Sequence, residues 1–120
     1  MHKLLTTSCG LAALGLSLQA NALNILLTND DGCRAPGIQA VYQSLRDAGH
    51  QVTLVAPELD NSGIGAASVV HPGQALAVTE LAAGQYCVGA PADYVPPTGK
   101  GSAIATPVDA VNVGLDLLQD

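Results

Sequence analysis

A short apolar run followed by a polar cluster is the first clear structural pattern in the chain. Residues 23–28 read LNILLT, and Asn29, Asp30, Asp31 and Gly32 come directly after them. A continuous apolar run of this length, bounded by turn-forming residues, is typical of a strand that is buried on both faces. The pattern therefore predicts a strand over residues 23–28 with a polar loop at its carboxyl end.

A helix and a second strand follow this loop. Pro36 suits a first helical turn, and Gly49 suits the position after a last turn. Residues 51–56 (QVTLVA) predict the second strand. A strand, a helix and a strand with short connections imply a parallel sheet covered on both faces. The expected fold class is α/β, with a Rossmann-like, doubly wound, mostly parallel sheet. The apolar side chains at helical spacing are Ile38, Val41, Tyr42 and Leu45.

Further candidate elements occupy the rest of the chain. Residues 58–68 are a loop rich in glycine, serine and acidic side chains, residues 75–79 and 85–88 predict a hairpin, and residues 89–101 are a proline- and glycine-rich loop. A helix is then predicted to start with Thr106 as N-cap, followed by Pro107 and by Asp109 in the first turn. Its expected inward stripe is Val111, Leu115 and Leu118.

The amino-terminal segment has the pattern of an export signal. Lys3 provides a positive start, residues 4–18 are uncharged and mostly apolar, and Ala20-Asn21-Ala22 is a small-x-small cleavage site. The run is shorter than the roughly 20 apolar residues that a membrane span needs. We therefore expect residues 1–22 to be a signal peptide and the mature chain, residues 23–120, to be periplasmic or secreted.

Cleavage at this site would remove Cys9 and leave Cys33 and Cys87. An even pair of cysteines in an exported protein allows a disulfide, whereas unpaired cysteines commonly serve as small buried hydrophobes. Both interpretations stay open at this point, and we slightly favour two free thiols.

Composition and charge exclude several classes of protein. Apolar residues make up 48% of the chain and charged residues 12%, which is unlike a disordered segment. The net charge of -6 offers no basic surface for nucleic acid and disfavours binding to an anionic membrane. Because Phe and Trp are both absent, we expect a thin core.

The two polar loops are where chemistry is expected. Ligands of parallel sheets gather at the carboxyl ends of the strands, so residues 29–32 and 58–68 should meet. Two adjacent carboxylates, Asp30 and Asp31, stay ionised side by side only near a positive charge. Oxygen donors without clustered His or Cys favour Mg²⁺, Mn²⁺ or Ca²⁺ over zinc or copper. A plain turn is the usual role of Asp-Asp-Gly, and the position after a strand makes a metal site equally plausible.

Several motifs resemble one enzyme family. Residues 23–45 closely resemble the start of the survival protein E (SurE) family of 5'/3'-nucleotidases, which opens with an apolar strand, N-D-D-G, A-P-G-I and a helix. Residues 55–57 (VAP) and 61–63 (NSG) are similar to later family elements. Residues 105–111 (ATPVDAV) fit the family's G-T-P-x-D-x-V element, and residues 89–95 (GAPADYV) are a rival. We prefer the later copy because its threonine can cap a helix, whereas the earlier copy runs into two prolines.

The resemblance implies a metal-dependent phosphatase that acts on nucleoside 5'- or 3'-monophosphates and related phosphomonoesters. It implies that Asp30 and Asp31 are catalytic and, with Ser62, bind Mg²⁺ or Mn²⁺. The metal is expected to polarise a phosphoryl oxygen and to lower the pKa of a bound water, while one aspartate accepts a proton. The neighbouring candidates for substrate binding are Asn29, Gly32, Asn61 and Gly63.

The family's further metal ligand, an asparagine in an S-G-I-N segment, has no counterpart in these 120 residues. We therefore expect residues 23–120 to be the amino-terminal part of a larger domain, which in the family forms a homodimer or tetramer. A haloacid dehalogenase-like phosphatase would need an Asp-x-Asp motif, which is absent at residues 29–31. Two interpretations without enzymatic activity stay open as well, namely a receiver-like module and an inactive metal-binding fragment.

Overall fold

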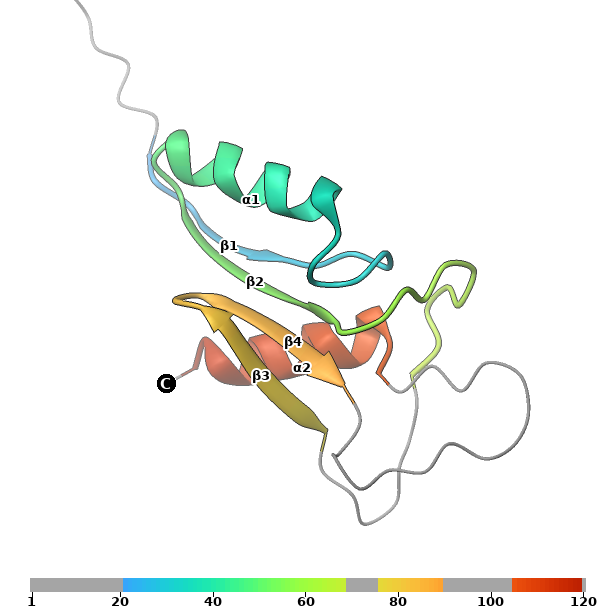
Figure 1. Ribbon diagram of the computed structural model, residues 1–120. Helices are drawn as coiled ribbons and strands as arrows, with labels where there is room; N and C mark the ends of the chain where they lie inside the picture. Colours follow the sequence, from blue (N-terminus) through green and yellow to red (C-terminus); the bar gives the residue numbers. More distant parts are fainter. Residues whose placement is uncertain (1–20, 69–75, 90–104, 120) are drawn as a thin grey trace, which may run out of the picture.

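Residues 21–68, 76–89 and 105–119 are described by the computed structural model. Residues 1–20 of the expected export signal, and most of the expected loop at 89–101, lie outside them. Four strands and two helices follow one another along the described residues (Figure 1). No helix in this part of the chain is both long and apolar enough to cross a membrane. The elements are β1 Asn24–Leu27, α1 Pro36–Asp47, β2 Gln51–Pro57, β3 Ala77–Ala82, β4 Gln85–Gly89 and α2 Pro107–Leu117.

The strands form one mixed sheet in the order β1-β2-β4-β3. Strands β1, β2 and β4 are parallel, and β3 runs antiparallel to β4. The predicted α/β fold with a mostly parallel sheet is therefore confirmed, as is the hairpin. Strand β3 continues past Thr79 to Ala82, so that Ala83 and Gly84 make the turn. A register irregularity between Glu80 and Ala82 accompanies this turn.

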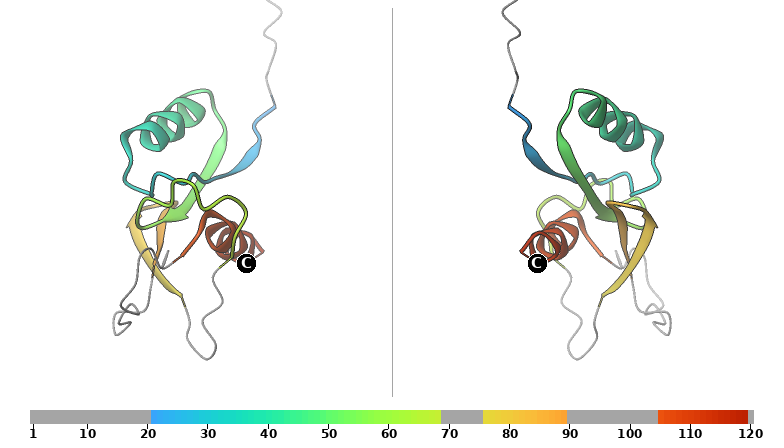
Figure 2. Two further views of the ribbon diagram at one scale, coloured as in Figure 1. Left: turned by 90° about the vertical axis from the view of Figure 1, so that its right-hand side faces the viewer. Right: turned by 90° about the vertical axis from the view of Figure 1, so that its left-hand side faces the viewer.

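The two helices cover opposite faces of the sheet (Figure 2). Strand β2 contributes side chains to the core on both faces of the sheet, because successive side chains of a strand point to opposite faces. Its residues Val52, Leu54 and Ala56 pack with Ile38 of α1, and Val55 packs with Ala110 of α2. This arrangement is the doubly wound layering that the strand–helix–strand pattern predicts.

The predicted inward faces of both helices need correction. In α1, Ile38 and Tyr42 are buried as predicted, but Val41 is 47% exposed. In α2 the predicted stripe is wrong, since Leu115 is 50% and Leu118 48% exposed while Ala110 and Gly114 are buried. The reason is close packing: a Cβ at Gly114 would lie 2.5 Å from Cδ1 of Leu26. The smallest residues of α2 thus face the sheet, and its leucines face outward. Val111, the third residue of the stripe, is partly exposed.

The expectation of two free thiols is also wrong. Cys33 and Cys87 form a disulfide with a Cα–Cα distance of 5.4 Å. Cys87 pairs with Ala56 across β2 and β4, and the backbone N–H of Cys33 donates to the carbonyl oxygen of Pro57 at 2.7 Å. The end of β2 therefore brings together two cysteines that are 54 positions apart in the sequence.

The start of α2 agrees with the sequence in detail. Thr106 is its N-cap, and Pro107 stands in the first turn. The Thr106 hydroxyl oxygen accepts from the backbone N–H of Asp109 at 3.2 Å, while the Asp109 carboxylate accepts from the backbone N–H of Thr106 at 2.9 Å. This reciprocal capping box satisfies two backbone donors that the helix itself leaves unpaired.

Replacing the capping residue should destabilise the fold. Thr106→Ala is expected to lower the free energy of unfolding by about 1 to 2 kcal/mol, because it removes an acceptor from a buried N–H. Urea denaturation followed by circular dichroism measures the change. Thr106→Ser, the matched control, keeps the hydroxyl and should lose less than half as much. Equal losses in the two variants would mean that the methyl group, and not the cap, is important.

Candidate active site

The loops that leave β1 and β2 lie together at the carboxyl edge of the sheet. The backbone N–H of Asn61 donates to the carbonyl oxygen of Asp30 at 2.6 Å. Beside it, the hydrogen bond from the N–H of Cys33 to the carbonyl oxygen of Pro57 joins the first loop to the end of β2, from which the second loop starts. The expectation that residues 29–32 meet residues 58–68 is therefore confirmed, and its cause is the parallel pairing of β1 with β2.

Asp30 and Asp31 are both exposed on the first loop. Gly32, which follows them, is buried and has a φ of 105°, a conformation that side chains disfavour. A Cβ at Gly32 would lie 3.5 Å from the backbone oxygen of Glu58. Glycine thus lets the chain turn back against the second loop and leaves the two carboxylates at its outer surface.

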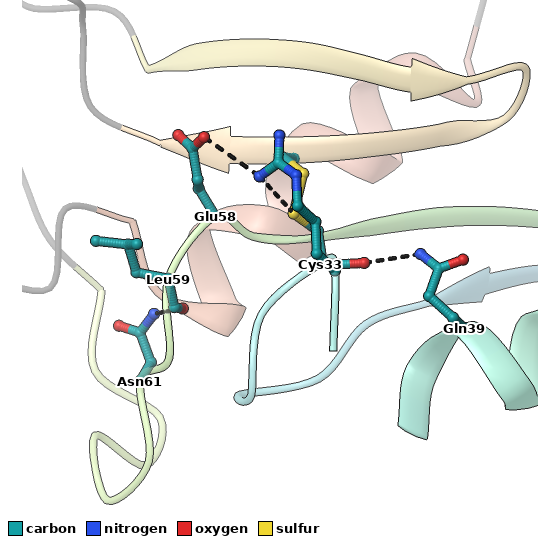
Figure 3. Close-up of a disulfide and its surroundings, with 7 residues drawn as sticks. Cys33, Gln39, Glu58, Leu59 and Asn61 are labelled. Carbon is teal, nitrogen blue, oxygen red and sulfur yellow. Dashed lines mark hydrogen bonds and ion pairs between the residues drawn. A yellow bond between two sulfur atoms is a disulfide. The ribbon is translucent and has the colours of Figure 1, made fainter. Parts of the chain in front are cut away.

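Three buried side-chain oxygens around these loops find no hydrogen-bond partner among the described residues: Thr28 Oγ1, Asn29 Oδ1 and Asn61 Oδ1. Asn61 is only 6% exposed, and its amide is oriented by the hydrogen bond from Nδ2 to the carbonyl oxygen of Leu59 at 2.8 Å (Figure 3). Unpaired buried oxygens are uncommon in proteins and indicate an ion, a water or a ligand that completes them. The sequence pointed to Asn29 and Asn61 only as possible substrate contacts, and Thr28 carried no signal of its own.

Ser62 and Gly63 are exposed in the second loop. The backbone N–H of Ser62 donates to Oδ1 of Asp60 at 2.7 Å. The Ser62 hydroxyl, followed by this N–H, lowers the pKa of the Asp60 carboxyl below its usual value. Asp60 was not among the predicted site residues, although an Asp two positions before a loop residue is a known signal for a side-chain-to-backbone turn. It holds the segment that contains Ser62.

Arg34 provides positive charge near the loops. Its Nη1 lies 3.4 Å from Oε1 of Glu58 and 3.7 Å from Sγ of Cys33 (Figure 3). The two charged side chains are 54% and 43% exposed, so the ion pair contributes only about 0 to 1 kcal/mol to stability. Arg34 can therefore exchange Glu58 for an incoming anion at little cost.

The candidate metal ligands at this edge of the sheet are all oxygen atoms. No cluster of three His, Cys, Asp or Glu side chains occurs within the described ranges. A cation would therefore rely on the two adjacent carboxylates and on neutral oxygens, including those of Ser62 and Asn61. Hard divalent cations such as Mg²⁺ and Mn²⁺ prefer such ligands, so the residues present fit this class of metal.

Comparisons with known proteins point to one family. The family model described as "Survival protein SurE" matches residues 25–120. The protein named 5'-nucleotidase SurE from Desulfovibrio desulfuricans is 40% identical over 97 residues, which cover 80% of this chain and 32% of the relative. The one from Geobacter sulfurreducens is 41% identical over 96 residues, with 80% and 30% covered. This chain thus spans about a third of the length of these relatives.

A solved structure agrees with these matches. The crystal structure of the SurE protein from Aquifex aeolicus superposes with a TM-score of 0.56 at 27% sequence identity. The superposition covers 81% of this chain and 32% of the Aquifex chain. The sheet and helices described above therefore have the arrangement found in that protein.

The Asp60 carboxyl should report the state of the second loop. Because its pKa is lowered in the folded loop, its stabilising effect is present above the unfolded-state pKa and is lost as the pH falls through the folded-state value. Ser62→Ala should raise the Asp60 pKa, measured by ¹³C NMR titration of the carboxyl group. Ser44→Ala, which removes a hydroxyl bonded to Ala40 in α1, is the control and should leave it unchanged. An unaltered Asp60 pKa in Ser62→Ala would contradict this assignment.

Proposed function

This chain belongs to the survival protein SurE family, and from that membership we propose that it forms part of a metal-dependent phosphomonoester hydrolase. The proposed substrates are nucleoside monophosphates, with phosphate at the 5' or 3' position. The observation that carries the proposal is the meeting of the Asp30–Asp31 loop with the Asn61–Ser62 loop at one edge of the sheet. The relatives from Desulfovibrio desulfuricans and Geobacter sulfurreducens are named 5'-nucleotidases, which supports a nucleotidase.

Asp30, Asp31 and Ser62 are proposed to hold Mg²⁺ or Mn²⁺. Such an ion, when bound, supplies a Lewis acid for the phosphoryl oxygen and lowers the pKa of a water. One of the two aspartates is proposed to accept a proton, because both carboxylates are exposed at the loop surface. The buried oxygens of Asn29 and Asn61 orient donors of the substrate or of its water shell.

Phosphate needs positive charge to approach this acidic chain, whose net charge is -6. The cation supplies part of that charge, and Arg34 supplies more from the adjacent loop position. The backbone N–H of Gly63 is proposed as a further phosphate donor, since Gly63 is exposed in the second loop and has a φ of 85°, whereas the buried Gly32 is proposed to shape the turn that presents the carboxylates. The complete protein is proposed to be a homodimer or tetramer, as the family resemblance implies.

The two carboxylates provide the direct test. Asp30→Asn and Asp31→Asn should each reduce Mn²⁺-dependent phosphate release from a nucleoside monophosphate by roughly 100-fold or more, because the metal loses a charged ligand. Asp116→Asn, at an exposed position near the end of α2, is the matched control and should keep full activity. Near-normal activity in either loop variant would overturn the assignment.

The length of the active polypeptide needs a separate measurement, because the chain spans about a third of its relatives. Phosphate release by the 120-residue chain should be compared with that of a product extended through the downstream reading frame. Activity only in the extended product would assign the chain to part of a site. Mn²⁺ binding without activity in both products would favour a metal-binding chain that is not an enzyme.

We propose that the chain is exported to the periplasm or secreted, and that its signal peptide is cleaved after Ala22. Two observations support it. The carbonyl oxygen of Leu23 accepts from the N–H of Gln51 at 2.8 Å, so the described chain joins the sheet at the expected mature terminus. The Cys33–Cys87 disulfide suits an oxidising compartment outside the cytoplasm.

Processing can be tested by mass spectrometry of the fractionated protein. The periplasmic or secreted form should begin at Leu23, and changing Ala20 and Ala22 to Arg should block cleavage because small side chains are required there. Ala13→Leu keeps the apolar run and is the control that should still be processed. Unprocessed protein confined to the cytoplasm would contradict export.

A further inference from the structure

The Cys33–Cys87 disulfide links the loop of the proposed metal site to the interior of the sheet (Figure 3). Cys33 directly follows Gly32, and Cys87 lies on β4. We propose that this bond is a positioning element: it fixes the loop that presents Asp30 and Asp31, and opening it weakens divalent cation binding by both carboxylates. The part that concerns the cation rests on the proposed function, and the part that concerns the loop does not.

The two carboxylates depend on their backbone for position. Neither the Asp30 nor the Asp31 side chain has a hydrogen bond or ion pair with any residue that the structure describes. Their place is therefore decided by the backbone. The carbonyl oxygen of Asp30 accepts from the N–H of Asn61 at 2.6 Å, a bond that can exchange for one with water, and the chain on either side fixes the rest. On one side is β1, whose partner among the described strands is β2. On the other side is Cys33, which is completely buried.

Cys33 is held at three points. Its N–H donates to the carbonyl oxygen of Pro57 at 2.7 Å, its own carbonyl oxygen accepts from Nε2 of Gln39 at 2.8 Å, and its sulfur is bonded to Cys87. The two hydrogen bonds can exchange for bonds with water when the loop opens. The disulfide cannot, so it is the anchor that persists through such fluctuations.

The disulfide also connects two segments that the backbone hydrogen bonds of the sheet do not join directly. Strands β1 and β4 are not neighbours, because β2 lies between them. The bond passes from the loop after β1, across the end of β2, to a β4 residue that is 1% exposed. It thereby ties the loop that carries the carboxylates to a buried residue of β4, a strand that does not pair with β1.

Opening the bond should leave the core intact. Cys33 and Cys87 lie in the cluster on the α1 side, where a thiol still packs as a small apolar group. Strand β2 keeps its partners on both sides. The expected consequence of reduction is a local loosening of residues 29–35, and the rest of the sheet stays protected.

Hydrogen exchange measures this loosening directly. The experiment uses the 120-residue chain with Cys9→Ser, in which Cys33 and Cys87 are the remaining cysteines. A dithiol reduces their disulfide by transferring two electrons and two protons, which gives two protein thiols and the oxidised, cyclic form of the reagent. A thiol count of two confirms complete reduction. Amide exchange in residues 29–35 should accelerate by roughly tenfold or more, while exchange in residues 51–57 should change less than about twofold. The Kd for Mn²⁺ should rise by roughly tenfold.

Two variants in the same background control this experiment. Cys33→Ala with Cys87→Ala should match the reduced protein and should not respond to the dithiol. Gln39→Ala removes one hydrogen bond from Cys33 but keeps the disulfide, so it should change the Kd for Mn²⁺ less than about threefold. A Gln39→Ala effect as large as that of reduction would show that any loosened contact suffices, and would overturn the special role of the disulfide.

The remaining outcomes are distinct. Unchanged exchange at residues 29–35 after reduction overturns the proposal, and so does loss of protection across residues 51–57, because the bond would then maintain the whole fold. An unchanged Kd for Mn²⁺ with a loosened loop overturns the part that concerns the cation. If the oxidised chain binds no Mn²⁺ at all, the proposed metal site fails, and hydrogen exchange alone decides whether the bond positions the loop.

Discussion

Parallel pairing of β1, β2 and β4 is the interaction on which the other features depend. In parallel strands all carboxyl ends lie at one edge, so every loop that follows a strand starts from the same side of the sheet. The register that places Leu27 opposite Leu54 therefore also places the Asp-Asp-Gly turn beside the loop that contains Asn61 and Ser62. Shifting this register would separate the two loops without changing either sequence.

The core on the α2 face of the sheet is made of small side chains. On the α2 face the buried members are Val55, Val88, Ala105 and Ala110, and Gly114 allows α2 to lie directly against Leu26. Close packing of small residues yields many van der Waals contacts but buries limited apolar area. The chain contains neither Phe nor Trp. Two local interactions supplement the packing: the Cys33–Cys87 disulfide holds the loop after β1, and the Thr106–Asp109 capping box holds the start of α2.

The charges at the candidate site follow from the need to bind phosphate on a negatively charged chain. An acidic chain repels phosphate, so the site needs local positive charge, which a divalent cation and Arg34 are proposed to supply. The second loop is organised by an acidic group of its own, since the Asp60 carboxylate accepts from Ser62, which lowers the pKa of Asp60. The carboxylates of the two loops thus have different tasks: Asp60 holds backbone, and Asp30 and Asp31 face outward with their oxygens available.

The local sequence determined the elements whose signals are contiguous. The LNILLT strand, the helix after Pro36 and the capped start at Thr106 all follow from neighbouring residues, because backbone hydrogen bonds and caps span only a few positions. The doubly wound sheet and the meeting of the two loops followed from these elements. Only the tertiary structure decided which face of α2 is inward, that Val41 is exposed, that Asn61 is buried and that Cys33 bonds to Cys87. These depend on distances between segments far apart in the chain, which no local pattern encodes.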